Sequence, residues 1–221
     1  MVVLRLVKFE AISTGLKGDT TDFVLPAKLG MKHANFIAEK TEGKEKHAAM
    51  ELAGSALPTI IITVHEVPVQ GLAAFVGWCY TRKIHTVDDD ERGAEWLALV
   101  HAYMTGTYLE AAAFQNAVVD AAIEKFDADG QLPTAKAVLA LEACKPRAGL
   151  LEKLLVDLWA YHGSRQKQDA IDDMFGNDDT CIFGARFMLQ LARELVLQKP
   201  LTITTVPKYK TKPCPYHIRP Q

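Results

Sequence analysis

The sequence predicts an α+β domain: a small β-sheet near the amino end, a cluster of helices that covers it, and an all-helical extension after the domain. Two observations predict this class. Residues Thr59–Val64 are all β-branched, which favours a buried strand. From Val69 onward apolar residues recur at spacings of three and four, which is typical of helices packed on one face. A hydrophobic fraction of 49% and a charged fraction of 24% are those of an ordinary globular chain.

The amino-terminal third alternates short strand and helix signals. Residues Val2–Val7 alternate weakly and are predicted as a first strand, which Phe9 and Ile12 extend. A loop follows at Ser13–Asp22, where Gly, Asp and Thr are frequent. Phe23–Leu29 is an edge strand at most, because Pro26 lacks an N–H donor. Gly30–Lys40 is predicted as a short helix.

A helix directly follows the β-branched strand. Pro68 suits the first turn, where a helix loses no N–H bond to proline. Val69, Leu72, Phe75 and Cys79 then form one apolar face, and the basic pair after Thr81 suits the helix C-terminus.

The rest of the chain reads as helices with an aromatic core. A helix ended by Gly106 is predicted first, then one over Tyr108–Phe126, and Pro133 begins the next. Further helical segments are predicted around Leu150–Trp159 and Ile182–Val196. Four aromatic residues at helical spacing are predicted as core: Trp78, Trp96, Tyr103 and Trp159.

Several of these segments resemble BTB/POZ domains, in particular those of fungal proteins. The segment after the β-branched strand is similar to the family's FVxWLYTGxI, with Phe75, Val76, Trp78, Tyr80, Thr81 and Ile84 matching and with Cys79 and Arg82 at the leucine and glycine positions. Phe114–Ala121 (FQNAVVDA) matches a family helix almost position by position. LLVDLWAYHGS at Leu154–Ser164 resembles the helical extension of fungal members, and Cys214-Pro215-Tyr216-His217 resembles a Cys-x-Tyr-His closing motif of some of them.

The resemblance implies a division of the chain and a function. It implies a BTB/POZ-like domain over residues 1–127, a helical extension over 128–198 and a basic, proline-containing tail over 199–221. The implied function is non-enzymatic protein–protein interaction, as a scaffold that oligomerises with itself or with another BTB protein. An alternative is a substrate adaptor of a cullin ubiquitin ligase. Family members that bind cullin carry a bulky apolar residue two before a glutamate, whereas this chain has Gly43-Lys44-Glu45, which weakens that alternative.

The sequence contains no pattern typical of an active site. It has no P-loop, GxGxxG or HExxH, and none of its three serines lies in a GxSxG turn. Cys79 lies on an apolar stripe and is predicted to be a core residue. Cys144 precedes a loop at Lys145-Pro146, a position that allows solvent exposure, and nothing in the sequence pairs it with a histidine. We therefore predict no catalytic residue and no cofactor.

One thin metal-site candidate exists. Cys214 and His217, joined by Cys181 or His162, would supply three soft ligands. The competing interpretation is that Tyr216 and His217 dock on the helical extension. We adopt this interpretation and therefore predict no metal site. The acidic run 88–91 is predicted to be a solvated loop that caps the next helix.

Net charge and the length of apolar segments limit the kinds of partner and the cellular location expected for the protein. The net charge is −2, which argues against a nucleic-acid partner held by electrostatics. Residues 199–221 carry five basic residues and no acid, and they are predicted to be either a solvated terminus or a basic contact strip. No apolar run reaches membrane-spanning length, and the amino terminus does not resemble a signal peptide. With four widely spaced cysteines as well, we expect an intracellular protein, cytoplasmic or nuclear.

Overall fold

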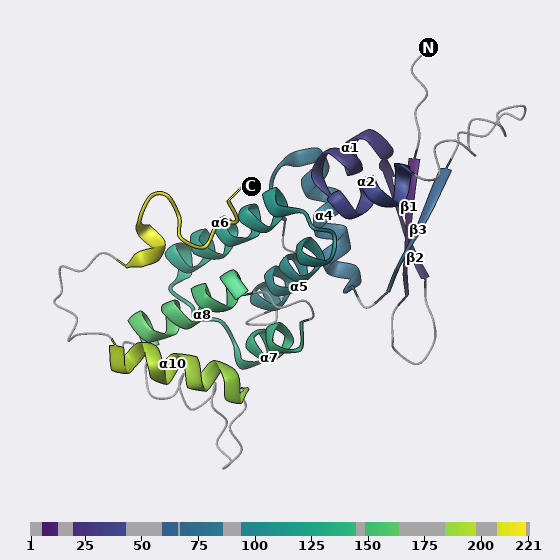
Figure 1. Ribbon diagram of the computed structural model, residues 1–221. Coiled ribbons are helices and arrows are strands. Elements are labelled where there is room, and N and C mark those ends of the chain that lie inside the picture. Colours follow the sequence, from purple (N-terminus) through teal and green to yellow (C-terminus); the bar gives the residue numbers. More distant parts are fainter. Residues whose placement is uncertain are drawn as a thin grey trace, which may run out of the picture.

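The structure is a computed structural model that describes residues 6–12, 20–42, 59–65, 67–85, 94–144, 149–163, 184–197 and 207–219. Its elements, in chain order, are β1 Leu6–Ile12, β2 Thr20–Pro26, α1 Ala27–His33, α2 Asn35–Glu42, β3 Thr59–His65, α4 Val69–Thr81, α5 Ala94–Tyr108, α6 Ala112–Asp129, α7 Ala135–Ala143, α8 Gly149–His162, α10 Ala185–Leu197 and the 3-10 turn η2 Lys208–Lys210. Figure 1 shows the strands at one end of the molecule and α10 and η2 at the other.

The three strands pair in the order β2-β1-β3. β1 runs antiparallel to β2, with Phe9 opposite Phe23, and parallel to β3, with Phe9 opposite Ile62. Among strand residues the structure describes the side chains of Phe23, Leu25 and Pro26, and Leu25 is fully buried. The strands lie beside α1 and α2 at the edge of the helical body (Figure 1).

The expected fold class is wrong. The protein is mostly helical, with helix making up 76% of the residues whose side chains the structure describes, and its core is not built on a β-sheet as the expected α+β fold requires. Most described core residues lie on helices that pack against other helices. The physical reason is visible in the sequence: only one stretch is continuously β-branched, whereas apolar residues recur with the helical period over most of the chain, so burial occurs mainly between helices.

An aromatic cluster joins α4 to α6 at the centre of the described core. The ring of Phe75 lies 5.2 Å from that of Phe114 in an edge-to-face arrangement, and Trp78 lies 5.3 Å from the same Phe114 ring. All three side chains are buried. The core prediction is confirmed for Trp78 and also for the other three residues named with it: Trp96, Tyr103 and Trp159. Such offset and edge-to-face pairs add stability beyond the area they bury.

Two glycines allow the central helices to approach closely. A side chain at Gly71 on α4 would collide with the backbone of His101 and with Thr105 on α5. At Gly106 a methyl group would lie 2.7 Å from Cγ of Gln115. The prediction that Gly106 ends its helix is wrong, because α5 continues to Tyr108. Gly106 is required for close packing on α6, not as a helix stop.

The end of α4 has an unusual residue in a left-handed conformation. Arg82 has φ 59° and its N–H donates to the carbonyl of Trp78 at 2.8 Å, which closes the helix. This conformation favours glycine. The guanidinium of Arg82 lies 4.6 Å from the ring centroid of Trp78 and hydrogen-bonds to His33. Burial, with the nearby guanidinium, lowers the pKa of His33. These contacts stabilise arginine at a position where it has no conformational advantage.

Two indole N–H groups hold the turn between α6 and α7. Trp96 donates to the carbonyl of Gln131 at 3.2 Å and Trp159 donates to that of Pro133 at 3.1 Å. Thr134 caps α7 by accepting from the N–H of Ala137. The buried residues of α7 and α8 belong to the same core cluster as those of α4, α5 and α6. The boundaries expected at residues 127 and 198 stay predictions.

A partly buried ion pair attaches α10 to α8. The guanidinium of Arg186 donates two hydrogen bonds of 2.7 Å to the two carboxylate oxygens of Glu152, whose side chain is 6% exposed. The N-terminus of α10 is also held by α7, since the N–H of Phe187 donates to Glu142 Oε1 at 2.6 Å. Bidentate geometry of this kind is among the stronger charged contacts. The position of α10 is therefore fixed by both polar and apolar contacts.

Candidate functional site

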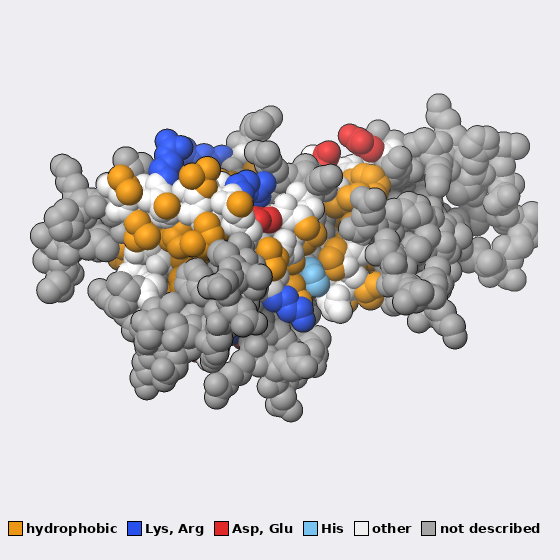
Figure 2. All heavy atoms as spheres, turned by 90° about the horizontal axis from the view of Figure 1, so that it is seen from below, with side chains coloured by type: hydrophobic (Ala, Val, Ile, Leu, Met, Phe, Trp, Pro, Cys, Tyr) orange, Lys and Arg blue, Asp and Glu red, His pale blue; other side chains and the backbone are white. Residues whose placement is uncertain are grey.

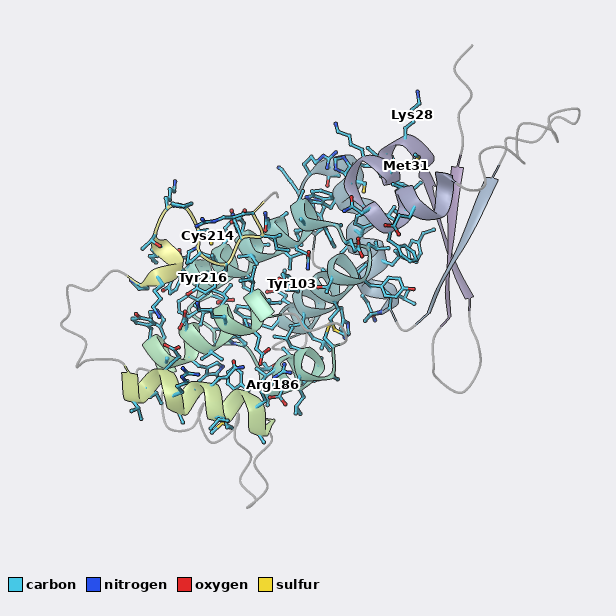
Figure 3. All side chains as sticks on the ribbon, viewed as in Figure 1. Lys28, Met31, Tyr103, Arg186, Cys214 and Tyr216 are labelled. Atoms are coloured by element: carbon cyan, nitrogen blue, oxygen red, sulfur yellow. The ribbon has the colours of Figure 1, made fainter. Side chains whose placement is uncertain are left out.

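The C-terminal segment, defined here as residues 207–219, folds back over α6 and α8 (Figure 1). Two tyrosines anchor it: Tyr209 in η2 is 4% exposed and Tyr216 is fully buried. Figure 3 places Tyr216 between this segment and α8, and Arg186 on the opposite side of α8. We call the residues that receive the segment the docking surface: Asn116, Asp120, Phe126, Asp157 and His162.

The deepest contact joins Tyr216 to Asp157. The tyrosine hydroxyl donates to Oδ2 of the aspartate, and both residues are 0% exposed. Within the described part of the chain, Oδ1 of Asp157 is buried without a hydrogen-bond partner. Burial raises the pKa of Asp157, and the hydrogen bond from Tyr216 opposes that rise. A half-satisfied carboxyl in a dry site favours its neutral form.

The same site makes the phenol of Tyr216 a weaker acid. Burial, together with the hydrogen bond to Asp157, raises the pKa of Tyr216. The hydroxyl therefore keeps its proton at physiological pH and acts as a donor to the carboxyl group.

Asn116 on α6 binds the main chain of the segment rather than a side chain. Its Nδ2 donates to the carbonyl of Ile218 at 3.0 Å, and the N–H of Ile218 donates to its Oδ1 at 2.7 Å. One helical turn further, Asp120 lies 2.8 Å from Nε2 of His217. Positions 116 and 120 share a helix face, so α6 presents both groups to the same stretch of chain.

A second aromatic contact holds the start of the segment. Tyr209 and His162 share a 2.7 Å hydrogen bond between the phenol oxygen and Nε2. The ring of Phe126 lies 4.6 Å from that of His162 and 6.1 Å from that of Tyr209. This trio fixes η2 against the end of α6 and the end of α8.

Two exposed ion pairs lie at the rim. Lys208 is 3.6 Å from Glu194 of α10, and Lys210 is 3.0 Å from Asp127 of α6. Exposed pairs of this kind contribute little to stability. The two lysines of the basic tail lie against acidic residues while their side chains stay about half exposed.

The described members of the metal-site candidate, His162, Cys214 and His217, do not form a three-ligand group. His162 faces Tyr209 and His217 faces Asp120, while Cys214 is half-buried. Cys181 lies outside the described residues, as do the acidic run 88–91 and residues 43–45. Among the residues that the structure describes, no three His, Cys, Asp or Glu side chains are grouped to hold a metal ion.

The two cysteines weighed as nucleophiles are both buried. Cys79 is 2% exposed, which confirms the core prediction, and burial raises the pKa of its thiol to about 11. Cys144 is only 4% exposed, so the solvent exposure that its position before the loop allowed is not found. Burial raises its pKa as well, and a thiol in such a setting forms little thiolate.

α10 presents an apolar face to solvent. Phe187 and Leu191 are buried, whereas Leu189 is 73% exposed and Val196 is 85% exposed. Figure 2, which views the molecule from below, shows hydrophobic side chains gathered along α10 with Lys and Arg side chains beside them. Within the described part of the chain, every helix is too short or too polar to cross a bilayer.

The sequence indicated part of this site. It predicted that Tyr216 and His217 dock on the helical extension over 128–198. Tyr216 does so, on α8, whereas His217 contacts Asp120 of α6, which precedes the extension. It did not identify Asp157 or Asn116 as the receiving groups. An available signal was the acid at position 157, which interrupts an otherwise apolar helical run.

Comparison with models of known protein families and with curated protein sequences gave no match. The likeness to BTB/POZ domains therefore depends only on the motifs quoted above.

Proposed function

We propose that this protein acts through protein–protein contacts, as a non-enzymatic scaffold that associates with a second copy of itself through the exposed face of α10. The observation that carries the proposal is the exposure of Leu189 and Val196 on a helix whose opposite face is already buried. Exposed large apolar side chains that gather on one face are typical of interaction sites. As part of this proposal, we place the protein inside the cell, in the cytoplasm or the nucleus, as expected from the sequence.

The spacing along α10 suits a helix pair. Ala185, Leu189, Ala192 and Val196 are all exposed and follow one another at intervals of four, three and four residues. That is the spacing of a helix seam, in which small residues let the backbones approach and large ones fill the gaps. An antiparallel pairing about a two-fold axis near Ala192 sets Leu189 of one copy against the partner's Val196. Such an isologous contact closes as a dimer.

The expected affinity follows from the size of this face. A helix of 13 residues is roughly 20 Å long. A single helix pair buries less than the roughly 1,200 Å² of a standard stable interface. We therefore expect a concentration-dependent equilibrium between monomer and dimer, rather than an obligate dimer.

Sedimentation velocity and size-exclusion with light scattering test the proposal. The wild-type chain should shift from monomer toward dimer as its concentration rises through the micromolar range, and Leu189→Glu should remain monomeric. Tyr80→Glu is the matched control, because Tyr80 is also a large exposed side chain, at 58%, but lies on α4. A wild-type chain that stays monomeric at several hundred micromolar, or Tyr80→Glu abolishing the dimer as Leu189→Glu does, contradicts the proposal.

A further inference from the structure

We propose that a basic patch where α1 meets the end of α4 binds an acidic segment of a partner protein in extended conformation. The basic patch is defined as Lys28, Lys32, His33, Arg82 and Lys83. It is separate from the exposed face of α10, and its partner is a different protein rather than a second copy. Two observations carry the proposal: positive charge without a counter-charge, and an arginine fixed in place at a backbone position that favours glycine.

The patch gathers positive charge that no acid balances. Residues 26–38 and 67–85 supply its four Lys and Arg side chains and contain no Asp or Glu, although the whole chain has a net charge of −2. All four are exposed, and within the described part of the chain none of them makes an ion pair. Elsewhere four basic side chains are each paired with a carboxylate: Lys125, Arg186, Lys208 and Lys210. Like charges held together repel, and an anionic partner relieves that repulsion.

The side chain of Arg82 is held in place by the protein itself. Its Nη2 donates to Nε2 of His33, and its guanidinium lies over the ring of Trp78. The ring of His33 packs edge-on against the same indole, with 5.3 Å between the centroids. His33 accepts this hydrogen bond as a neutral ring, and burial followed by the charge of Arg82 lowers its pKa. The guanidinium therefore loses little conformational freedom when it binds a carboxylate.

The backbone of Arg82 supports the same interpretation. Its φ of 59° is a conformation that glycine adopts at the end of a helix without strain. Other residues held in this region cost conformational energy and cluster at sites that bind ligands. This position thus carries the side chain that suits carboxylates in place of the residue that suits the backbone.

The spread of the cations identifies the occupant as a segment of chain rather than a single ion. Lys28 and Lys32 share a face of α1 and are roughly 6 Å apart along its axis. Arg82 and Lys83 follow at the end of α4, on the far side of the contact with His33. Figure 3 shows Lys28 extending from α1 into solvent. Alternate side chains of an extended peptide are roughly 7 Å apart on one side, so acids at every second position match this arrangement.

The first measurement titrates the full chain carrying Leu189→Glu with a fluorescent eight-residue peptide that alternates Asp and Ser. Leu189→Glu removes the contact proposed for α10, so failure of this test leaves that contact untouched. We expect saturable binding in fluorescence anisotropy that weakens at least about tenfold between 20 and 200 mM NaCl, because exposed charges are screened. A matched peptide with Asn in place of Asp should not bind.

Arg82→Gly, added to the same protein, separates binding from folding. Since glycine suits this backbone conformation, the thermal midpoint should stay at or above that of the parent. The acidic peptide should nevertheless bind at least about fivefold more weakly. A protein with Lys28→Gln and Lys32→Gln should lose a similar amount and keeps Arg82. Lys136→Gln is the matched control, because Lys136 is an exposed lysine of α7 outside the patch, and it should bind as the parent does.

Three further titrations separate the kinds of anion. Inorganic phosphate, vesicles that contain phosphatidylserine and a single-stranded oligonucleotide should each bind more weakly than the acidic peptide. Absence of saturable peptide binding, or equal binding by Arg82→Gly and its parent, overturns the proposal. Tighter binding of any of the three competitors overturns an acidic protein segment as the occupant.

Discussion

Two buried acids on α8 attach two different elements, and they do so in opposite ways. Glu152 binds Arg186 of α10 through both of its oxygens. Asp157, five residues later, binds Tyr216 of the C-terminal segment through one oxygen and leaves the other without a partner in the described structure. Five residues turn a helix by about 140° beyond a full circle, so the two acids serve nearly opposite faces.

The comparison indicates which of the two junctions is the more stable. A carboxylate with a bidentate guanidinium is compensated for the loss of water. An unpartnered buried oxygen costs about 1–3 kcal/mol. The junction with the C-terminal segment is therefore the weaker of the two and is sensitive to protonation.

The largest expected effect comes from the core on which both junctions rest. Trp78→Ala should lower the free energy of unfolding by about 3–5 kcal/mol, because Trp78 is 4% exposed and contacts Phe75 and Phe114. Urea denaturation followed by circular dichroism measures the change. Tyr80→Ala on the same helix is the control, with an expected change below about 0.5 kcal/mol. A fully stable Trp78→Ala protein would show that the aromatic cluster is not the core.

Glu152→Gln should have the next largest effect on stability, because it weakens the junction between α8 and α10. The variant keeps the size of the side chain but leaves Arg186 without its charge partner, with an expected loss of about 1–3 kcal/mol, since the arginine side chain is 29% exposed and partly solvated. A double-mutant cycle with Arg186→Gln isolates the pair. Glu194→Gln, at the exposed 3.6 Å pair with Lys208, should change stability by less than about 0.5 kcal/mol. Equal effects at both sites would refute the ranking of the two pairs.

Tyr216→Phe affects the other junction. Removing the hydroxyl leaves Asp157 without its hydrogen bond, and we expect docking of the C-terminal segment to weaken by about 1 kcal/mol. Limited proteolysis within residues 207–219 should be several times faster, while the urea midpoint of the helical body changes little. Tyr80→Phe controls for the substitution itself. Unfolding of the whole body, in place of local release, would mean that the segment is part of the core.

The smallest expected effect is on pH dependence. Burial raises the pKa of Asp157 above its ordinary value of 3.8, so in the window between 3.8 and the raised value the folded protein binds a proton that the unfolded chain does not. The stability linked to this group is present at low pH and is lost as pH rises through the folded pKa. The groups around it are Tyr216, Lys208, Glu194 and Lys153.

Asp157→Asn tests that sign. Relative to wild type, the variant should be less stable at acid pH and gain relative stability as pH rises, because it cannot take up the proton. Thermal melts across the pH range from about 4 to 7 measure the difference. Asp127→Asn, at a 44%-exposed side chain, is the control and should show a weaker trend. A difference of the opposite sign would mean that Asp157 is stabilised in its charged form.

The sequence predicted most of the helices but not how they pack. The helices at Val69–Thr81, Ala94–Tyr108, Ala112–Asp129, Gly149–His162 and Ala185–Leu197 were expected from apolar spacing, with end points shifted by a few residues. The fold class was wrong, because one β-branched stretch was given more weight than the helical period of the rest. Gly106 was read as a stop because sequence spacing does not reveal that Gln115 lies against it.

The docking surface was less accessible to sequence reasoning. Tyr216 and Asp157 are 59 positions apart, and Asn116 and Ile218 are 102 apart. Local patterns extend over a few turns of helix and carry no information on such pairs. The basic composition of the tail left a solvated terminus and a contact strip as alternatives, and it did not identify the acidic partners, which are spread over α6, α8 and α10.

The hydrogen bonds between the Asn116 side chain and the main chain of Ile218 have a consequence for sequence variation at the two positions. Since both bonds reach only main-chain atoms of Ile218, they exclude only proline at position 218, whereas at position 116 they require a side chain that both donates and accepts. A saturation scan of the two positions should show one broad and one narrow tolerance profile. Related chains should then differ at 218 and agree at 116.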